Sequence, residues 1–238
     1  MRITQEGNLL QLTWMPGWFP VNCYLVVEEQ ELTLIDAAMS FSVQGILRTA
    51  AKLNLPLTRI VLSHAHGDHV GALDELKKRL PDAVVYISER DAALLGGDRS
   101  LRQGEPQTPI KGSLPKISTK PDILLHDGDT VGSLTAISTP GHTPGSMSFL
   151  DQRSGALIVG DAFQTFRGIA VAGTVVPWFP FPAMATWNKE QAVASAIKLA
   201  GTSAAVLAVG HGNLLKAPGE AMKQAVSKAQ LQLGKEGR

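Results

Sequence analysis

The chain has 238 residues, of which 44% are hydrophobic and 18% are charged, the composition of an ordinary globular protein. A formal net charge of +1 provides no basic footprint for nucleic acid and no attraction to an acidic membrane surface. The length allows one large domain or two small ones.

Short apolar runs rich in β-branched residues predict strands, and apolar residues at a helical period predict helices. Strands are expected near residues 9–14, 21–28, 31–36, 59–63, 83–87, 122–126, 134–139, 146–150, 156–160 and 204–209. Helices are expected near residues 41–54, 68–80, 88–95, 187–200 and 218–232. Strands come first, then strand and helix mix, and the second half repeats this order. Two sheets face to face with helices outside would bury these strands best.

The N-terminal residues contain no apolar segment of the kind found in signal peptides, so we expect a cytoplasmic protein. Cys23 is the single cysteine of the chain, which excludes an intrachain disulfide. It lies in a strand-like run and is interpreted as a small buried hydrophobic residue. Nothing in the cysteine content requires an oxidising compartment.

Residues 64–69 read HAHGDH and bring three histidines and an aspartate together in a chain that has six histidines. Neutral imidazole is the commonest protein ligand for zinc, and it also suits iron and nickel. The motif follows a strand-like run, so His64 and His66 should project to one side of extended backbone and share one ion. Asp68 and His69 follow a glycine that permits a sharp turn, and they can face a second ion nearby.

Residues 96–122 are rich in glycine, proline and basic residues and have no clear periodicity. A structureless segment of this length is uncommon inside a compact domain, where it forms a functional flap or a mobile connector. A solvated loop is the simpler interpretation, although its basic side chains could contact an anionic substrate. They are Arg99, Arg102, Lys111, Lys116 and Lys120.

Three further candidate ligands each follow an apolar strand-like run and stand beside a glycine. His142 lies in TPGHTPGS, Asp161 lies in VGDA, and His211 lies in VGHG. Glycine and proline fix tight turns at strand ends, where a polar side chain can reach a site. Together with the HAHGDH residues, these three are predicted to project from the ends of strands at one edge of the fold. His126 lacks this setting and is interpreted as a turn residue.

Most aromatic residues lie in two segments, one near the N-terminus and one that begins just after Asp161. Such residues can wall a small-molecule pocket, but they also fill cores and dimer interfaces. Residues 169–187 carry no charge, yet prolines break any membrane-spanning helix there, so a folded-back loop is expected. The candidates for substrate binding are Trp18, Phe19, Phe163, Phe166, Trp178, Phe179 and Phe181.

The motifs HAHGDH, TPGHTPGS, VGDA and VGHG, in this order over roughly residues 20–215, resemble those of the metallo-β-lactamase superfamily. The resemblance implies that residues 1–238 form a single α+β domain, an αββα four-layer sandwich with two metals at one edge. True β-lactamases usually carry cysteine or serine at the position of Asp161, so the glyoxalase II and lactonase-like branch is the better match. The implied ligands are His64, His66 and His142 for the first metal, Asp68, His69 and His211 for the second, and Asp161 as a bridge.

Two divalent cations that share a bridging water would lower its pKa and supply hydroxide, and one of them would polarise the substrate carbonyl. Asp68 is then a candidate proton acceptor as well as a ligand. The expected reaction is hydrolysis of a lactone, ester or thioester in a fairly apolar small molecule. Zinc is the expected metal, and the same ligands accept iron, manganese and cobalt.

Other functions stay open at this point. A sulfur dioxygenase of the superfamily would use a single iron, here held by His64, His142 and Asp161. A phosphodiesterase is the next alternative, although the near-neutral charge gives it little support. A metal-binding protein without activity would use the aromatic segments as a docking face. The expected partner is a small-molecule substrate, a homodimer stays open, and neither nucleic acid nor a membrane span is expected.

Overall fold

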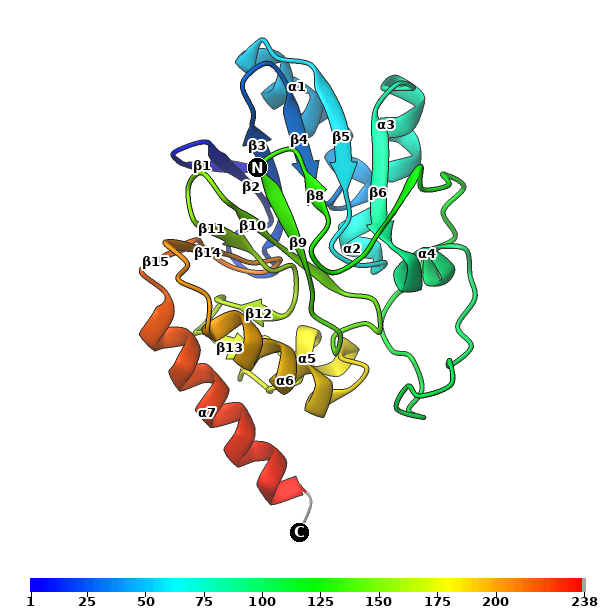
Figure 1. Ribbon diagram of the computed structural model, residues 1–238. Coiled ribbons are helices and arrows are strands. Elements are labelled where there is room, and N and C mark those ends of the chain that lie inside the picture. Colours follow the sequence, from blue (N-terminus) through cyan, green and yellow to red (C-terminus); the bar gives the residue numbers. More distant parts are fainter. Residues whose placement is uncertain (237–238) are drawn as a thin grey trace.

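The apolar runs of the N-terminal half form a seven-stranded sheet in the computed structural model, which describes residues 1–236 (Figure 1). Neighbouring strands from β1 to β4 are antiparallel, and those from β4 to β7 are parallel. The carboxyl ends of β4 to β7 therefore meet at one edge of this first sheet. In spatial order its strands are β1 (Arg2–Glu6), β2 (Leu9–Trp14), β3 (Val21–Val27), β4 (Leu32–Ile35), β5 (Leu57–Val61), β6 (Val84–Ser88) and β7 (Ile123–Leu125).

The second half of the chain builds a six-stranded sheet. Strand β10 is antiparallel to both β9 and β11, and β11 is parallel to β14, so β9, β11 and β14 all run in one direction. Their carboxyl ends consequently lie at the same edge. In spatial order the strands are β15 (Leu215–Lys216), β14 (Val206–Ala208), β11 (Ala156–Ile158), β10 (Met147–Asp151), β9 (Leu134–Ser138) and β8 (Thr130–Val131), and a separate pair is formed by β12 (Phe163–Gln164) and β13 (Ala170–Val171).

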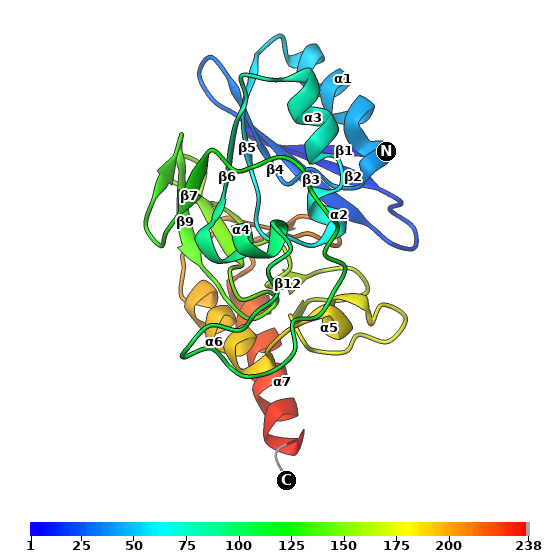
Figure 2. The same ribbon diagram turned by 90° about the vertical axis from the view of Figure 1, so that its right-hand side faces the viewer.

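Helices cover the outer faces of the two sheets, as the two views in Figures 1 and 2 show. Beside the first sheet lie α1 (Val43–Leu53), α3 (Leu73–Arg79) and α4 (Glu89–Leu95), with the 3-10 helix Ser40–Ser42 and the one-turn α2 (Gly67–Val70). Beside the second sheet lie α5 (Phe181–Ala185), α6 (Lys189–Ala200) and α7 (Gly219–Glu236), whose C-terminal end extends away from the body.

Three buried clusters separate the layers. The first lies between the first sheet and its helices and includes Leu34 and Ile46. The second lies between the sheets and includes Val26 and Phe149. The third lies between the second sheet and α6 and α7, where Leu207 is fully buried. The predicted αββα sandwich is confirmed, because each sheet buries one face against helices and the other against its partner sheet.

The single helix predicted over residues 68–80 is wrong, because the structure divides it into α2 and α3. The break lies at Gly71, where the chain passes close to the backbone that follows β4. A Cβ at this position would lie 2.8 Å from Ser40 N and 2.9 Å from Ala38 O. Only glycine allows such an approach, and it holds the end of HAHGDH against the edge of the first sheet.

Several short elements escape the sequence patterns, among them β1, β8, β12, β13, β15 and α5. Four of the five residues of β1 are exposed, so backbone pairing with β2 holds this strand rather than apolar burial. Residues 96–122 contain neither helix nor strand, as predicted. Uncharged residues 169–187 fold into β13, a loop and α5, and no helix within residues 1–236 is long and apolar enough to cross a membrane.

Candidate metal centre and cavity

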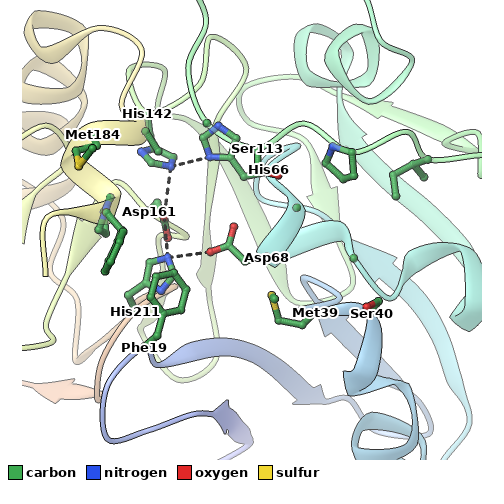
Figure 3. Close-up of a pocket in the computed structure, with 18 of the residues that line it drawn as sticks. Phe19, Met39, Ser40, His66, Asp68, Ser113, His142, Asp161, Met184 and His211 are labelled. Carbon is green, nitrogen blue, oxygen red and sulfur yellow. Dashed lines mark hydrogen bonds and ion pairs between the residues drawn. The ribbon is translucent and has the colours of Figure 1, made fainter.

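The seven predicted ligands follow strands of both sheets and meet at one edge of the sandwich. The HAHGDH segment connects β5 to α2, and the other three ligands follow β9, β11 and β14. Because these strands end at one rim, the topology brings four distant motifs into one cluster. Figure 3 shows five of these side chains turned toward one another.

Three groups of candidate ligands have nitrogen and oxygen atoms within 4.8 Å of one another, and one of them, His64 with His69 and Asp161, joins the two that are named below. Asp161 lies between the groups: its Oδ2 is 3.2 Å from His142 Nε2 and 3.1 Å from His211 Nε2. Its Oδ1 is 3.3 Å from His69 Nε2. A carboxylate in this position can contact ions in both groups. The first ligand group is His64, His66 and His142, and the second ligand group is Asp68, His69 and His211.

Three buried atoms of the cluster form no hydrogen bond with the described residues: His64 Nε2, His69 Nε2 and Asp161 Oδ1, of which the last two face each other at 3.3 Å. A buried polar group without a hydrogen bond costs about 1–3 kcal/mol, so the convergence of these atoms favours a ligand bound between them. Imidazole nitrogens and carboxylate oxygens are donors that zinc and other divalent metals of the first transition row accept. The residues present therefore fit metal ions.

Two histidines of the first ligand group direct their other ring nitrogen to segments outside the sheets. His66 Nε2 lies 3.0 Å from the carbonyl oxygen of Lys111, within residues 96–122. His142 Nδ1 lies 3.1 Å from Thr186 Oγ1, just after α5. These contacts orient the rings so that His66 Nδ1 and His142 Nε2 lie 2.9 Å apart. Such outer partners fix both the tautomer and the direction of a metal-binding imidazole.

Asp36, directly after β4, ties the HAHGDH segment to the first sheet. Its carboxylate accepts hydrogen bonds from Ser63 N at 2.7 Å, Ser63 Oγ at 2.8 Å and His69 Nδ1 at 2.8 Å. Ser63 Oγ also lies 2.9 Å from His64 Nδ1. The backbone of Asp36 has a φ of 61°, a left-handed conformation that aspartate tolerates better than most residues. One buried carboxylate thus orients two of the ligands.

His211 is placed by a backbone acceptor and by the glycine that precedes it. His211 Nδ1 lies 2.6 Å from the carbonyl oxygen of Pro20, at the start of β3. A Cβ at Gly210 would overlap Asp161 Oδ1, so only glycine lets this turn approach the carboxylate. The first glycine of the VGHG motif, Gly210, is therefore explained by the close approach of its backbone to the Asp161 carboxylate.

A second buried carboxylate, Asp91 in α4, joins two ligand-bearing loops. It accepts hydrogen bonds from Ala65 N in the HAHGDH segment at 2.9 Å and from Thr143 Oγ1 at 2.7 Å. Its other oxygen accepts from Gly145 N at 2.7 Å. The loop that carries His142 and the loop that carries the first histidines are therefore held in register by one side chain.

The charges of the cluster differ between the two ligand groups. Burial and the neighbouring imidazoles hold the pKa of His64 well below its ordinary value, and burial lowers the pKa of His142 to about 3. Burial also disfavours the charged form of His211, but the carboxylates of Asp161 and Asp68 outweigh it and raise its pKa to about 10. These histidines of the first ligand group are therefore neutral at pH 7, the form that binds a metal.

The cluster forms the floor of a cavity of about 730 Å³, a volume typical of small-molecule sites, which run from about 300 to 1,000 Å³. One wall is formed by Phe19 and by four residues of α5, namely Phe181, Pro182, Met184 and Ala185. The opposite wall is formed by Met39, Ser40, Gly112, Ser113, Pro115, Lys116 and Ile117. The irregular segment 96–122 is therefore part of the site.

Residues 16–211 match the model of the Metallo-beta-lactamase superfamily, a span that includes all seven ligands. The chain belongs to the metallo-β-lactamase superfamily. Members of this superfamily are generally metal-dependent hydrolases. The chain is similar to the uncharacterized protein YobT of Bacillus subtilis (strain 168), with 61% identity over 230 residues, 96% of this chain and 99% of YobT. It is also similar to the probable metallo-hydrolase YflN of the same organism, with 30% identity over 204 residues, 78% of this chain and 76% of YflN.

Among solved structures, the chain resembles the protein TTHA1623 in a di-iron-bound form. The two chains are 26% identical, with a TM-score of 0.66 over 89% of this chain and 96% of TTHA1623. The fold is therefore shared with a protein whose structure was solved in a di-iron-bound form.

Four of the seven predicted substrate-binding aromatics form one wall of this superfamily site. Phe19 and Phe181 line the cavity, with ring centroids 5.1 Å apart. Phe179 lies behind them, 1% exposed, and its ring centroid is 5.5 Å from that of His211. Phe166 in turn packs on Phe179 at 5.0 Å. The latter two support the wall and do not line it.

The structure corrects the prediction for the other three aromatics. Phe163 lies on β12 and is fully buried in the core between the second sheet and its helices, although it stands two residues after Asp161. Trp18 and Trp178 are 68% and 90% exposed and lie outside the cavity lining. Sequence distance from a ligand does not determine the direction of a side chain, because the chain turns back into the core at β12.

Sequence patterns missed the residues that hold the ligands. Asp36 follows a strand just as Asp161 does, and this position in the sequence could have marked Asp36 as a candidate site residue. Asp91 and Thr186 carry no such signal, because their contacts depend on how α4 and α5 pack against the ligand loops. Met39 and Ser40 reach the cavity only because α2 ends at Gly71.

Proposed function

We propose that this chain is a dinuclear metal-dependent hydrolase that cleaves an activated acyl bond, a lactone, ester or thioester, in a fairly apolar small molecule. The observation that carries the proposal is the convergence of seven ligand side chains, three of them with unpaired buried atoms, at the floor of a 730 Å³ cavity. Membership of a superfamily of metal-dependent hydrolases supports it. The name of YflN, a probable metallo-hydrolase, agrees with it.

In this proposal each ligand group holds one ion and Asp161 contacts both. Five imidazoles and two carboxylates favour zinc, and they also accept iron, manganese and cobalt. The di-iron form of the similar protein TTHA1623 makes iron the main alternative. The neutral imidazoles of the first ligand group can bind without losing a proton, since burial keeps their pKa values low.

When bound, the ions would supply an activated water and a Lewis acid for the substrate carbonyl. Asp68 is the proposed proton acceptor, because its side chain is 23% exposed and lines the cavity, with Oδ2 3.3 Å from His211 Nε2. A carboxylate there can take the proton of the attacking water and pass it to the leaving group. Phe19 and Phe181 border the floor and would exclude bulk water from the acyl group.

The test is to remove metal with a chelator, to reconstitute the protein with zinc or iron, and to assay lactones, thioesters, aryl esters and a bis-aryl phosphate. We expect about two ions per chain and turnover of at least one acyl substrate that is lost with the metal and restored with it. A single iron with thiol-dependent oxygen uptake and no hydrolysis would establish a sulfur dioxygenase instead. Turnover of the bis-aryl phosphate alone would establish a phosphodiesterase.

A further inference from the structure

The two walls of the cavity differ in polarity. The wall opposite α5 contributes the hydroxyls of Ser40 and Ser113 and the ammonium of Lys116. Figure 3 shows Phe19 and Met184 on one side of the ligand cluster and Ser40 on the other. A substrate that spans the floor therefore meets an apolar surface at one end and polar donors at the other. The apolar wall consists of Phe19, Phe181, Pro182, Met184 and Ala185.

The three polar side chains of the second wall are not used within the protein. Within residues 1–236, the side chains of Ser40, Ser113 and Lys116 form no hydrogen bond or ion pair. Asp74, a carboxylate on the same wall, is already occupied, since it accepts from Thr119 N at 2.7 Å and from Thr119 Oγ1 at 2.6 Å. Of the described lining residues, Lys116 is also the single lysine or arginine. Its ammonium thus has no internal counterion.

The backbone that carries Lys116 is anchored on both sides. Before it, the carbonyl oxygen of Ser113 accepts a hydrogen bond from Gly67 N at 2.8 Å, next to the ligand His66. After it, Ser118 N donates to Asp74 at 2.9 Å. Fixed backbone with free polar side-chain ends is the arrangement expected of a binding surface, because the ordering cost is met before the ligand arrives.

We propose that this wall binds a carboxylate on the leaving-group part of the substrate, while the acyl part lies against the apolar wall. The inference rests on the proposed hydrolase function and names its substrate class. Lys116 is the single lysine or arginine of the described lining and Ser113 lies on the same segment, a donor pair that suits a monoanionic carboxylate, whereas a phosphate dianion commonly draws on arginine forks or several backbone N–H groups.

The chemistry balances with water as the single co-reactant. The oxygen of water forms a bond to the acyl carbon, and the bond from that carbon to the leaving oxygen or sulfur breaks. One proton of the water passes to the leaving atom. The products are the acyl acid and an alcohol, phenol or thiol that still carries its carboxylate against Lys116.

The kinetic test compares two esters with the metal-loaded protein, 4-nitrophenyl octanoate and 3-carboxy-4-nitrophenyl octanoate. The variants are Lys116→Ala and, as a control, Lys120→Ala, an exposed lysine of the same segment that does not line the cavity. Lys116 is exposed, so we expect Lys116→Ala to raise KM for the carboxylate ester by no more than about fivefold, the size of a favourable ion pair at an exposed site. In Lys116→Ala, kcat for the carboxylate ester and both kinetic constants for the neutral ester should be unchanged. Lys120→Ala should have the same kinetic constants as the parent protein for both esters. Added salt should reduce the preference of the parent protein for the carboxylate ester over the neutral ester.

A binding measurement separates this inference from the proposed function. Isothermal titration compares 3-octanamidobenzoate with the neutral N-phenyloctanamide, two amides that require no turnover. We expect the charged amide to bind about fivefold more tightly, with the advantage lost in Lys116→Ala alone. Equal binding of both amides by all three proteins would overturn the carboxylate site even if the esters are hydrolysed. Selective binding without hydrolysis of any ester would support the site and overturn the hydrolase.

Discussion

The two ligand groups of the metal centre have similar donor atoms but are held by different parts of the molecule. The second ligand group is held by the first sheet: Asp36 after β4 orients His69, and the carbonyl of Pro20 before β3 orients His211. These acceptors directly flank β3 and β4, whose side chains are buried except for the half-buried Val27. The position of this group is therefore set by the core of the domain.

The first ligand group depends instead on the segments that form the walls of the cavity. His66 contacts the carbonyl of Lys111 in the irregular segment 96–122, and His142 contacts Thr186 after α5. Contacts of a substrate with the walls can therefore act on the outer partners of these two ligands, whereas Asp36, the outer partner of His69, is buried and does not line the cavity. We therefore expect metal binding at the first group and substrate binding to be coupled, and coupling of this kind is reciprocal.

Asp161→Ala should cause the largest loss of metal and of activity. The Asp161 carboxylate contacts both ligand groups, so its removal should weaken metal binding at both of them. Metal content should fall at both groups, and hydrolysis should fall by more than about 100-fold. Elemental analysis, turnover and thermal unfolding measure this. Asp151→Ala is the control, since Asp151 is a buried carboxylate of β10 that binds Asn8 and Arg153 away from the cavity. It should lower stability and keep its metals.

Asp36→Ala should affect the second ligand group more than the first. Removing this acceptor leaves Ser63 N and His69 Nδ1 unpaired, which costs about 1–3 kcal/mol for each buried group. Metal affinity of the second group should fall by about 10–100-fold, the usual cost of losing an outer partner. Metal titration and urea unfolding measure the two effects. Unchanged affinity in a less stable protein would mean that Asp36 supports the fold alone.

Gly112→Ala tests whether the wall segment 112–117 positions His66 of the first ligand group. A Cβ at Gly112 would overlap the imidazole of His66, so the variant should displace that ring and weaken metal binding at the first group about tenfold. Gly104→Ala is a matched control, because Gly104 has the same φ of +86° in the same segment and nothing within 4 Å of its Cβ position. Equal losses of metal affinity in both variants would assign the effect to backbone strain. The first ligand group would then not depend on contact with this wall.

Thr186→Val should produce the smallest effect on the first ligand group. It removes the oxygen that faces His142 Nδ1 but keeps the shape of the side chain. We expect metal affinity to fall severalfold, about 1 kcal/mol for one hydrogen bond, with the second group unaffected. Thr49→Val is the control, because its buried hydroxyl donates to Gly45 O within α1. The idea fails if both variants bind metal like the parent protein.

Much of the fold and the clustering of the seven candidate ligands could be predicted from local patterns. Alternating and continuous apolar runs identify the long strands, since burial of one or both faces leaves a clear period. Short strands such as β1 escape because their side chains are exposed and only backbone pairing defines them. The ligands His142, Asp161 and His211 were recognisable because each follows a strand and stands beside a glycine.

The outer partners could not be predicted, because any residue type can offer a carbonyl. Lys111 and Pro20 contact ligand imidazoles through backbone oxygens, so no side-chain pattern marks them. The aromatic residues show the same limit, since Phe163 has polar neighbours in the sequence yet lies in the core, while Phe181 lies in an apolar run yet lines the cavity.

The sequence by itself determined the donor chemistry of this protein, since the residue types and glycine turns that suit a metal are local properties of the chain. Only the tertiary structure decided how close the candidate ligands lie to one another, what orients each imidazole and which side chains line the cavity. Those properties arise where strand ends of two sheets and two irregular segments meet, and the contacts between them join residues that are far apart in the chain.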